Sequence, residues 1–369
     1  MNRRWSQRLT GRVRNSYKLQ RLRALVSWAM EWRVRPFLLQ ACVRHVYGPT
    51  ELRYGEEELV ALCVVRNGTL HVRSFLDHHL SLGVKHVVLL DNGSTDDTVE
   101  LARRVGRVTI LRTGLPYRTY ETVMKRYLVR RFCAERWSLT VDIDERFDYP
   151  FSKAMDVGGL LSYLNDRGYT AVLAQILDCF ADGPLRDLKD LDGVPRQSLE
   201  ARYPYYDTSM VEAHVYRFGT PANPAIKMHA GGIRKSIFGT ENGLTKASLI
   251  RLTRGLVPFV GFHQSANSAI ADFSGALLHY PFAGDFREKV EEAVLTDRYR
   301  VSAAGEYRAY WARLKDDPEL SLRRPTARRF VGVDALLDEG FLVVSPEYRR
   351  WVETYAAERT RHGEPPPRP

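Results

Sequence analysis

The sequence lacks the motifs of several common protein classes. It has no Cys-x-x-Cys pair, so a zinc ribbon is not expected. It also lacks Gly-x-Gly-x-x-Gly after its first apolar run, Gly-x-x-x-x-Gly-Lys-Ser/Thr, and Gly-x-Ser-x-Gly. These absences argue against a classical dinucleotide site, a P-loop NTPase and the usual hydrolase elbow. The four cysteines are scattered, at Cys42, Cys63, Cys133 and Cys179.

Long apolar runs are absent as well. No stretch approaches the roughly 18 apolar residues that span a bilayer, and no short charged start precedes an unbroken apolar stretch, so a secretory signal is not expected. Scattered thiols in apolar surroundings fit a reducing compartment. We therefore expect a cytoplasmic protein, and its N-terminal arm leaves open a peripheral position on the inner face of the membrane.

Acidic residues are almost missing from the first 50 positions. This segment holds ten Arg, one Lys and the single acid Glu31, a net charge of +10 out of +11 for the whole chain. The remaining body is near neutral, so a nucleic-acid partner is not expected. Apolar residues recur at helical spacing at Leu19, Leu22, Leu25, Val26, Ala29 and Trp32.

A basic helix with a Trp/Leu face can lie in the interface of an anionic membrane. We predict this role for residues 1–46, with Pro36 breaking the helix and Phe37–Val46 forming a second piece. A helix docked on the body and an organelle transit peptide remain alternatives.

Apolar runs alternate with helical patterns over the next part of the chain. Such β-α-β-α order predicts a doubly wound α/β sheet, in which ligands bind beyond the carboxyl ends of the strands. The expected strands are Leu59–Val65, Val87–Leu90, Val108–Leu111 and Ala171–Leu177, and the expected helices are Leu70–Leu82, Asp96–Val105, Tyr120–Glu135, Asp285–Tyr310 and Pro346–Arg359.

The segment Leu139–Asp148 carries the strongest chemical signal. Its apolar residues alternate with polar ones as in a strand, which predicts that Asp142 and Asp144 share one face at the strand end. Neighbouring carboxylates are costly without a cation or a shared proton between them, and oxygen ligands suit Mg²⁺ or Mn²⁺. An acidic loop after an edge strand is the alternative. Arg66-Asn67 and Asp91-Asn92 end two other strands, so they should converge on the same rim.

These three strand ends resemble the GT-A fold glycosyltransferases. The matching residues are Arg66-Asn-Gly-Thr, Asp91-Asn-Gly-Ser-Thr-Asp-Asp-Thr and Asp142-Ile-Asp-Glu, and the resemblance is to the family-two-like branch with an Asp-x-Asp-Glu metal motif. It covers roughly Glu57 to Phe282 and extends weakly beyond. It implies a mixed sheet flanked by helices and the transfer of a sugar from a nucleoside-diphosphate sugar to a hydroxyl acceptor, with Mn²⁺ or Mg²⁺.

The resemblance also implies roles for individual residues. The nucleotide sugar would be held by Arg66, Asn67, Asp91, Asn92, Asp142, Arg234 and Lys246, with Asp91 at the base and the last two at the diphosphate. The metal would be held by Asp142, Asp144 and His279, with His263 a weaker candidate. A neutral imidazole is needed for this, so donor binding is expected to weaken as the pH falls through the mid-sixes. An inverting enzyme needs a carboxylate base, for which Asp178, Glu212, Glu241 and Asp272 are candidates.

The expected organisation is a basic arm at 1–50, a GT-A catalytic domain at 51–283, a helical C-terminal extension at 284–361 and a disordered tail at 362–369. The expected acceptor is a glycan, a lipid-linked or another hydroxyl compound, in cell-surface polysaccharide or glycoconjugate synthesis. Tyr203, Tyr205 and Tyr206 could stack on a sugar or pack on the body. Alternatives for the whole chain are a nucleotidyltransferase that makes nucleotide sugars, a non-catalytic basic-arm binding protein and a GT-A pseudoenzyme.

Overall fold

The computed structural model describes residues 25–188, 200–259, 263–299 and 301–363. One large mixed sheet runs through these residues in the order β1-β4-β3-β2-β5-β11-β7-β12-β6, and the short strands β8 and β13 extend it beside β7. The strands are β1 (Arg44–Tyr47), β2 (Val60–Val65), β3 (His86–Asp91), β4 (Val108–Arg112), β5 (Trp137–Thr140), β6 (Glu145–Asp148), β7 (Ala171–Phe180), β8 (Tyr205–Tyr206), β11 (Thr245–Arg251), β12 (Ile270–His279) and β13 (Arg328–Arg329). A separate two-stranded sheet joins β9 (Val211–His214) and β10 (Met228–Gly231).

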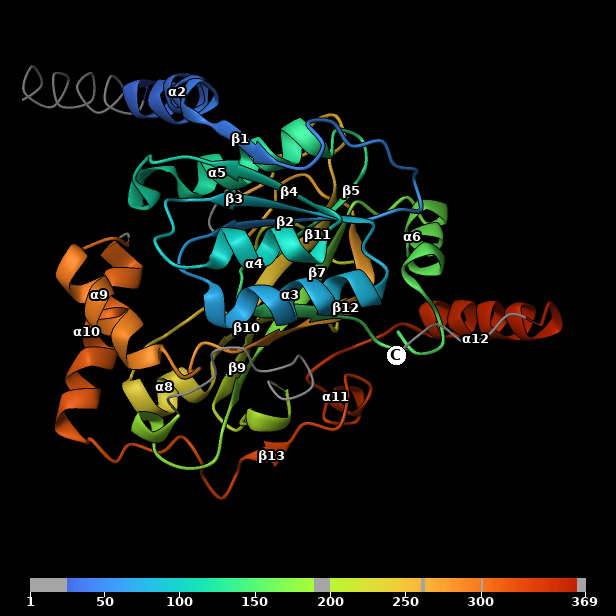
Figure 1. The fold of residues 1–369 in the computed structure, drawn as a ribbon. Helices are drawn as coiled ribbons and strands as arrows, with labels where there is room; N and C mark the ends of the chain where they lie inside the picture. Colours follow the sequence, from blue (N-terminus) through green and yellow to red (C-terminus); the bar gives the residue numbers. More distant parts are fainter. Residues whose placement is uncertain (1–24, 189–199, 260–262, 300, 364–369) are drawn as a thin grey trace, which may run out of the picture.

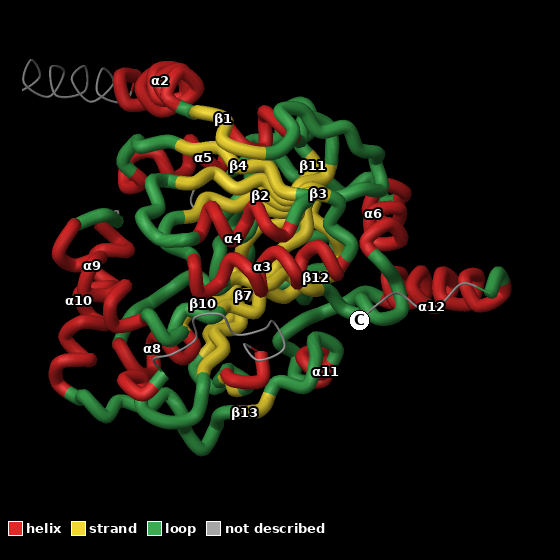
Figure 2. Tube along the Cα trace, viewed as in Figure 1, coloured by secondary structure: helices red, strands yellow, loops and turns green. Residues whose placement is uncertain are grey.

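Helices cover both faces of the sheet (Figures 1 and 2). They are α2 (Arg35–Cys42), α3 (Thr69–Leu82), α4 (Thr98–Val105), α5 (Tyr117–Phe132), α6 (Val157–Asp166), α8 (Gly232–Phe238), α9 (Phe286–Thr296), α10 (Val301–Asp316), α11 (Ala335–Asp338) and α12 (Pro346–Arg361). The predicted α/β class, a mixed sheet flanked by helices, is confirmed. None of the described helices is both long enough and apolar enough to span a bilayer.

Strand β2 shows why the first half folds as predicted. All six of its residues are buried, and alternate side chains enter two different cores. Ala61 and Cys63 pack with helices α3, α4, α6 and α12, whereas Leu62 and Val64 pack with α2 and α5. A continuous apolar run is what a parallel strand buried on both faces requires.

The strand directions bring many chain segments to one rim. Strands β4, β3, β2 and β5 run parallel, β11 is antiparallel to both β5 and β7, and β12 is parallel to β7. Strand β6 is antiparallel to β12, with Glu145 opposite His279. The carboxyl ends of β2, β3, β5, β7 and β12 therefore meet the starts of β6 and β11.

The N-terminal arm differs from its prediction in two ways. Pro36 does not break the helix, because a π-helical segment at Met30–Val34 precedes α2 and the chain stays helical through the proline. A π-helical turn is one way to accommodate a helical proline. In addition, β1 pairs with β4, so the end of the predicted arm belongs to the sheet. Residues 1–24, including Leu19 and Leu22, lie outside the described residues.

The C-terminal segment also departs from the sequence pattern. The single helix predicted over Asp285–Tyr310 is two helices, α9 and α10, and Asp297 at the end of α9 has a positive φ of 44°. Their apolar residues Phe286, Val290 and Tyr310 pack on Phe180 and Phe282. The two helices therefore stand beyond the ends of β7 and β12 (Figure 1). Residues 364–369 of the predicted tail lie outside the described residues.

Candidate active site

A cavity of about 1130 Å³ opens at the rim where the strands end. Its wall includes Arg66 and Asn67 after β2, the turn residues Asp142 and Asp144 after β5, and His279 at the end of β12. Helices α9 and α10 close the opposite side, with Lys289 among their lining residues. The expected convergence of separate strand ends is thus present, and it defines the candidate site.

The acidic segment is a turn rather than the end of a strand. Strand β5 stops at Thr140, and β6 begins at Glu145 at the far edge of the sheet, so Asp142 and Asp144 lie on the connection between them. Arg146 fixes this turn by donating to the carbonyl of Ile143 at 3.0 Å and to Ser74 Oγ of α3 at 2.5 Å. The alternation that predicted a strand is therefore misleading here.

Two buried lysines hold the carboxylate of Asp142. Lys246 Nζ lies 2.6 Å from Asp142 Oδ2, and Lys125 Nζ lies 3.2 Å from Oδ1. Lys246 also binds both oxygens of Glu145 at 2.7 and 2.8 Å, and Lys125 reaches Glu121 at 3.4 Å. Burial alone would raise the pKa of Asp142, but the two ammonium groups outweigh burial and hold that pKa far below its usual range.

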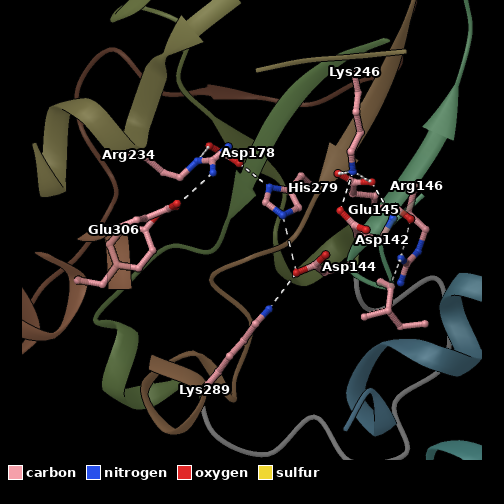
Figure 3. Close-up of polar contacts among 12 residues, drawn as sticks. Asp142, Asp144, Glu145, Arg146, Asp178, Arg234, Lys246, His279, Lys289 and Glu306 are labelled. Atoms are coloured by element: carbon pink, nitrogen blue, oxygen red, sulfur yellow. Dashed lines mark hydrogen bonds and ion pairs between the residues drawn. The ribbon is translucent and has the colours of Figure 1, made fainter. Parts of the chain in front are cut away.

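Asp144 has a different set of partners. Lys289 Nζ from α9 lies 2.9 Å from Asp144 Oδ2, and His279 Nε2 lies 3.7 Å from the same oxygen (Figure 3). Burial favours the neutral acid, but Lys289 and then His279 hold the pKa of Asp144 well below its usual range. Asp144 is therefore an anion that faces the cavity beside the ammonium group of Lys289 and the ring of His279.

His279 begins a chain of polar contacts that leads away from the turn. Its Nδ1 donates to Asp178 Oδ1 at 2.6 Å, and Arg234 Nε donates to Asp178 Oδ2 at 2.7 Å. Arg234 continues to Glu306 of α10 at 3.4 Å (Figure 3). Burial lowers the pKa of His279, but Asp144 and Asp178 outweigh it and raise that pKa to about 9. Without a metal ion, the pKa of His279 thus lies above the mid-six value expected from the sequence.

The residues fit a divalent cation only in part. Among the described residues, no three His, Cys, Asp or Glu side chains form a group that could hold a metal, so the expected set of Asp142, Asp144 and His279 is not assembled. The reason is that Asp142 turns both oxygens toward lysines. Asp144 and His279 do fit, because Asp178 holds Nδ1 and leaves Nε2 facing Asp144, which is how protein carboxylates orient metal-binding histidines.

The predicted nucleotide residues divide into two groups. Arg66, Asn67 and Asn92 line the cavity. Asp91 does not, because it is fully buried and its oxygens accept from Arg112 Nε at 2.6 Å and from the Ser94 amide at 2.9 Å. Its carboxylate thus stabilises the loop after β3. Arg234 lines the cavity, and Lys246 is buried behind Asp142.

The four candidate bases are spread widely. Glu241 lines the cavity, and Asp178 lies just behind it, bound to His279 and Arg234. Glu212 is on β9, outside the lining residues, and pairs with Lys235. Asp272 lies near the start of β12, toward the opposite rim, where it accepts from Tyr163 Oη at 2.6 Å. Position therefore removes Asp272 and Glu212 from the site.

Several residues of the site have no motif in the sequence. They are Tyr117, Glu121 and Lys125 of α5, Lys289 and Glu292 of α9, and Arg298, Tyr299, Glu306 and Tyr307 around α10. Glu145 of β6 was also not predicted as a site residue, although it ends the Asp-x-Asp-Glu motif. None of the three tyrosines considered for sugar stacking lines the cavity: Tyr203 and Tyr206 are buried in a separate core, and Arg323 lies over the ring of Tyr205 at 3.9 Å from its centroid.

Comparisons with known proteins give matches to solved structures only. No family model matches the sequence, and no curated protein sequence matches it. One match is glucosyl-3-phosphoglycerate synthase from Mycobacterium tuberculosis, solved with Mn²⁺, UDP and glucosyl-3-phosphoglycerate. It shows 20% identity over 33% of this chain and 44% of that chain, with a TM-score of 0.25.

Another match is a mannosyltransferase from Pyrobaculum calidifontis, solved with GDP-Man and Mn²⁺. It shows 17% identity over 46% of this chain and 50% of that chain, with a TM-score of 0.26. The matched segments thus span about half or less of either solved chain. TM-scores this low do not establish a common fold over the whole chain, so the residues of the cavity have to carry any functional conclusion.

Proposed function

We propose that the protein is a metal-dependent glycosyltransferase that moves a sugar from a nucleoside-diphosphate sugar to a hydroxyl acceptor. The observation that carries this proposal is the placement of Asp144 and His279, oriented by Asp178, in one large cavity at the strand ends. A divalent cation held by Asp144 and His279 would stabilise the negative charge that a diphosphate leaving group develops. A glycan or lipid-linked acceptor in polysaccharide or glycoconjugate synthesis is part of the same proposal.

The wall of the cavity supports a nucleotide as the donor. Tyr299 and Tyr307 stack with ring centroids 4.6 Å apart, and Tyr117 meets Tyr299 edge-on at 6.1 Å. All three line the cavity, and aromatic surfaces of this kind contribute about 1–3 kcal/mol per stacked nucleobase. Arg66 and Arg298 lie on the same wall and provide cations for phosphate oxygens. Glu241, which is exposed and lines the cavity, is our choice among the bases.

The test is a donor screen on the full chain. Purified protein with Mn²⁺ is given UDP-sugars and GDP-sugars with simple hydroxyl acceptors, and the release of UDP or GDP is measured. Asp144→Asn should lower the rate at least about 100-fold, as loss of a charge-stabilising contact does. Asp166→Asn, on an exposed part of α6, is the matched control and should keep the wild-type rate. Equal rates for Asp144→Asn and wild type would remove Asp144 from the chemistry.

We also propose that the N-terminal helix lies on an anionic membrane surface. One side of the helix docks on α5: Leu39 is buried, and Trp32 stacks on Arg126 at 4.0 Å. The other side leaves large apolar residues exposed, among them Leu25, Val26, Trp28, Val34, Phe37 and Leu38. An apolar face within an arginine-rich arm combines the two attractions that hold a helix on anionic lipid.

A further inference from the structure

Lysine 289 differs from the other two lysines at the acidic turn. The side chains of Lys125 and Lys246 are 3% and 4% exposed, and each is bound to two carboxylates. Lys289 is 30% exposed, lines the cavity, and hydrogen-bonds to Asp144 alone among the residues that the structure describes. An ammonium group has three N–H donors, so Lys289 keeps donors for a ligand in the cavity.

The helix that carries Lys289 presents one charged face to the cavity. Glu292 lies three residues further along α9, on the same face, and also lines the cavity. It pairs with Arg66 after β2 at 3.3 Å and with Arg298 at 4.0 Å. Through Glu292, this face of α9 contacts Arg66 and Arg298, the two arginines proposed to bind phosphate oxygens. Through Lys289, the same face contacts Asp144 of the acidic turn.

We propose that Lys289 is a diphosphate-binding residue that α9 supplies to the cavity, and that its ammonium group shares Asp144 with the divalent cation. The proposal takes the ligand class, a nucleoside diphosphate, from the proposed function. The assignment of Lys289 follows from the contact with Asp144 and from the exposure that separates it from Lys125 and Lys246.

Replacing Lys289 should change the affinity for a diphosphate and the affinity for a divalent cation in opposite directions. Without Lys289 the diphosphate loses a charged hydrogen bond, so its binding should weaken. The same change removes a positive charge that lies 2.9 Å from Asp144 Oδ2. A divalent cation at this oxygen is repelled by the ammonium group and has to share the oxygen with it. The cation should therefore bind more tightly when Lys289 is replaced. A lysine that only stabilises the fold predicts neither change.

The experiment uses the full chain with Lys289→Met, Lys289→Arg and the control Lys315→Met, which changes an exposed lysine of α10. Calorimetric titrations with inorganic pyrophosphate, UDP and GDP in EDTA should show Lys289→Met weakened about tenfold, or about 1.4 kcal/mol. Lys289→Arg should stay within about threefold of wild type, and Lys315→Met should match it. Titration with Mn²⁺ alone should show Lys289→Met tightened about threefold or more.

The titrations test the role of Lys289 independently of the glycosyltransferase proposal. Lys289→Met that binds pyrophosphate as tightly as wild type overturns the inference, as does wild-type protein that binds no pyrophosphate. Unchanged or weaker Mn²⁺ binding by Lys289→Met overturns the sharing of Asp144. If pyrophosphate binds through Lys289 while UDP and GDP do not bind with or without Mn²⁺, the inference stands and the proposed glycosyltransferase function fails.

Discussion

Lys246 Nζ lies 2.6 Å from Asp142 Oδ2 and within 2.8 Å of both oxygens of Glu145. The lysine comes from β11, Asp142 from the turn before β6 and Glu145 from the first position of β6, so one ammonium group joins segments about a hundred residues apart. The buried ammonium group offsets the negative charge of the two carboxylates. This contact assigns Lys246 to the support of the site rather than to the diphosphate contact expected from the sequence.

Lys246→Met should strongly destabilise the protein. The substitution leaves Glu145 buried without its cation and Asp142 with Lys125 alone, and breaking a buried ion pair costs about 3–5 kcal/mol. Urea unfolding at pH 7 measures the change in the free energy of unfolding. Lys227→Met is the control, because Lys227 is partly exposed and donates only to the carbonyl of Pro224 among the described contacts. A change below about 1 kcal/mol for Lys246→Met contradicts this account.

His279 and Asp178 should affect metal binding to different degrees. His279→Gln removes a proposed ligand and should weaken Mn²⁺ binding about 10–1,000-fold, or about 1.4–4 kcal/mol. Asp178→Asn only loosens the orientation of the imidazole, and such supporting contacts are worth about 10–100-fold. Titrations followed by the electron paramagnetic resonance of free Mn²⁺ measure both constants. A lower melting temperature with an unchanged Mn²⁺ constant in His279→Gln would make His279 purely structural.

Asp148 gives the protein a pH-dependent stability. Burial raises the pKa of Asp148 to about 6, above the ordinary carboxyl value, so the native state holds its proton more tightly than the unfolded chain. The stability from this group is fully present below about pH 4 and is lost as the pH rises through 6. Asp148→Asn keeps the acceptor for the Tyr149 amide, which Asp148 Oδ1 binds at 2.7 Å.

Asp148→Asn should therefore match the wild-type stability at pH 4 and exceed it at pH 7.5 by about 2 kcal/mol. Urea unfolding at the two pH values gives the comparison, and the exposed Asp166→Asn should change little at either. A constant difference between wild type and Asp148→Asn across this range shows that the carboxyl group does not titrate in the folded protein.

The exposed face of the N-terminal helix can be tested without deleting it. Burial of a phenylalanine or leucine side chain contributes about 1.5–3 kcal/mol. Phe37→Ser with Leu38→Ser should therefore lower co-sedimentation with anionic vesicles at least about tenfold. Leu295→Ser, which removes an equally exposed apolar residue on α9, should bind like wild type. If the Phe37/Leu38 variant sediments with the vesicles as wild type does, the membrane proposal fails.

The sequence predicts the parallel half of the fold well, for a physical reason. Strands β2, β3 and β4 are short apolar runs bounded by polar turns, and their helices have clear apolar faces, so local pattern and final structure agree. The turn after β5 could not be predicted in this way. Its residues alternate as a strand does, and its shape depends on the contact of Asp142 with Lys246 and of Arg146 with Ser74, which only the folded chain makes.

The site was predictable only where a motif marks it. Asp144 and His279 follow from strand ends, but Lys125 lies within a helix rich in arginine and reads as a solvent-facing cation. In the structure it is almost fully buried against Asp142. Asp91 shows the opposite error, since its position at the end of β3 suggests a ligand contact although its carboxylate is used by Arg112. Pairings between distant charges decide these roles, and local sequence does not encode them.

The position of the acidic turn also affects when the site can form during synthesis. Strand β6, which follows the turn, pairs with β12 alone among the described strands, and Glu145 stands opposite His279, 134 positions later in the chain. Until β12 leaves the ribosome, the turn has no strand partner on that side and lacks His279 and Lys289, although Lys246 of β11 has already been synthesised. We therefore expect a nascent chain to acquire affinity for the proposed cation and nucleotide abruptly, after about three quarters of its length, rather than strand by strand.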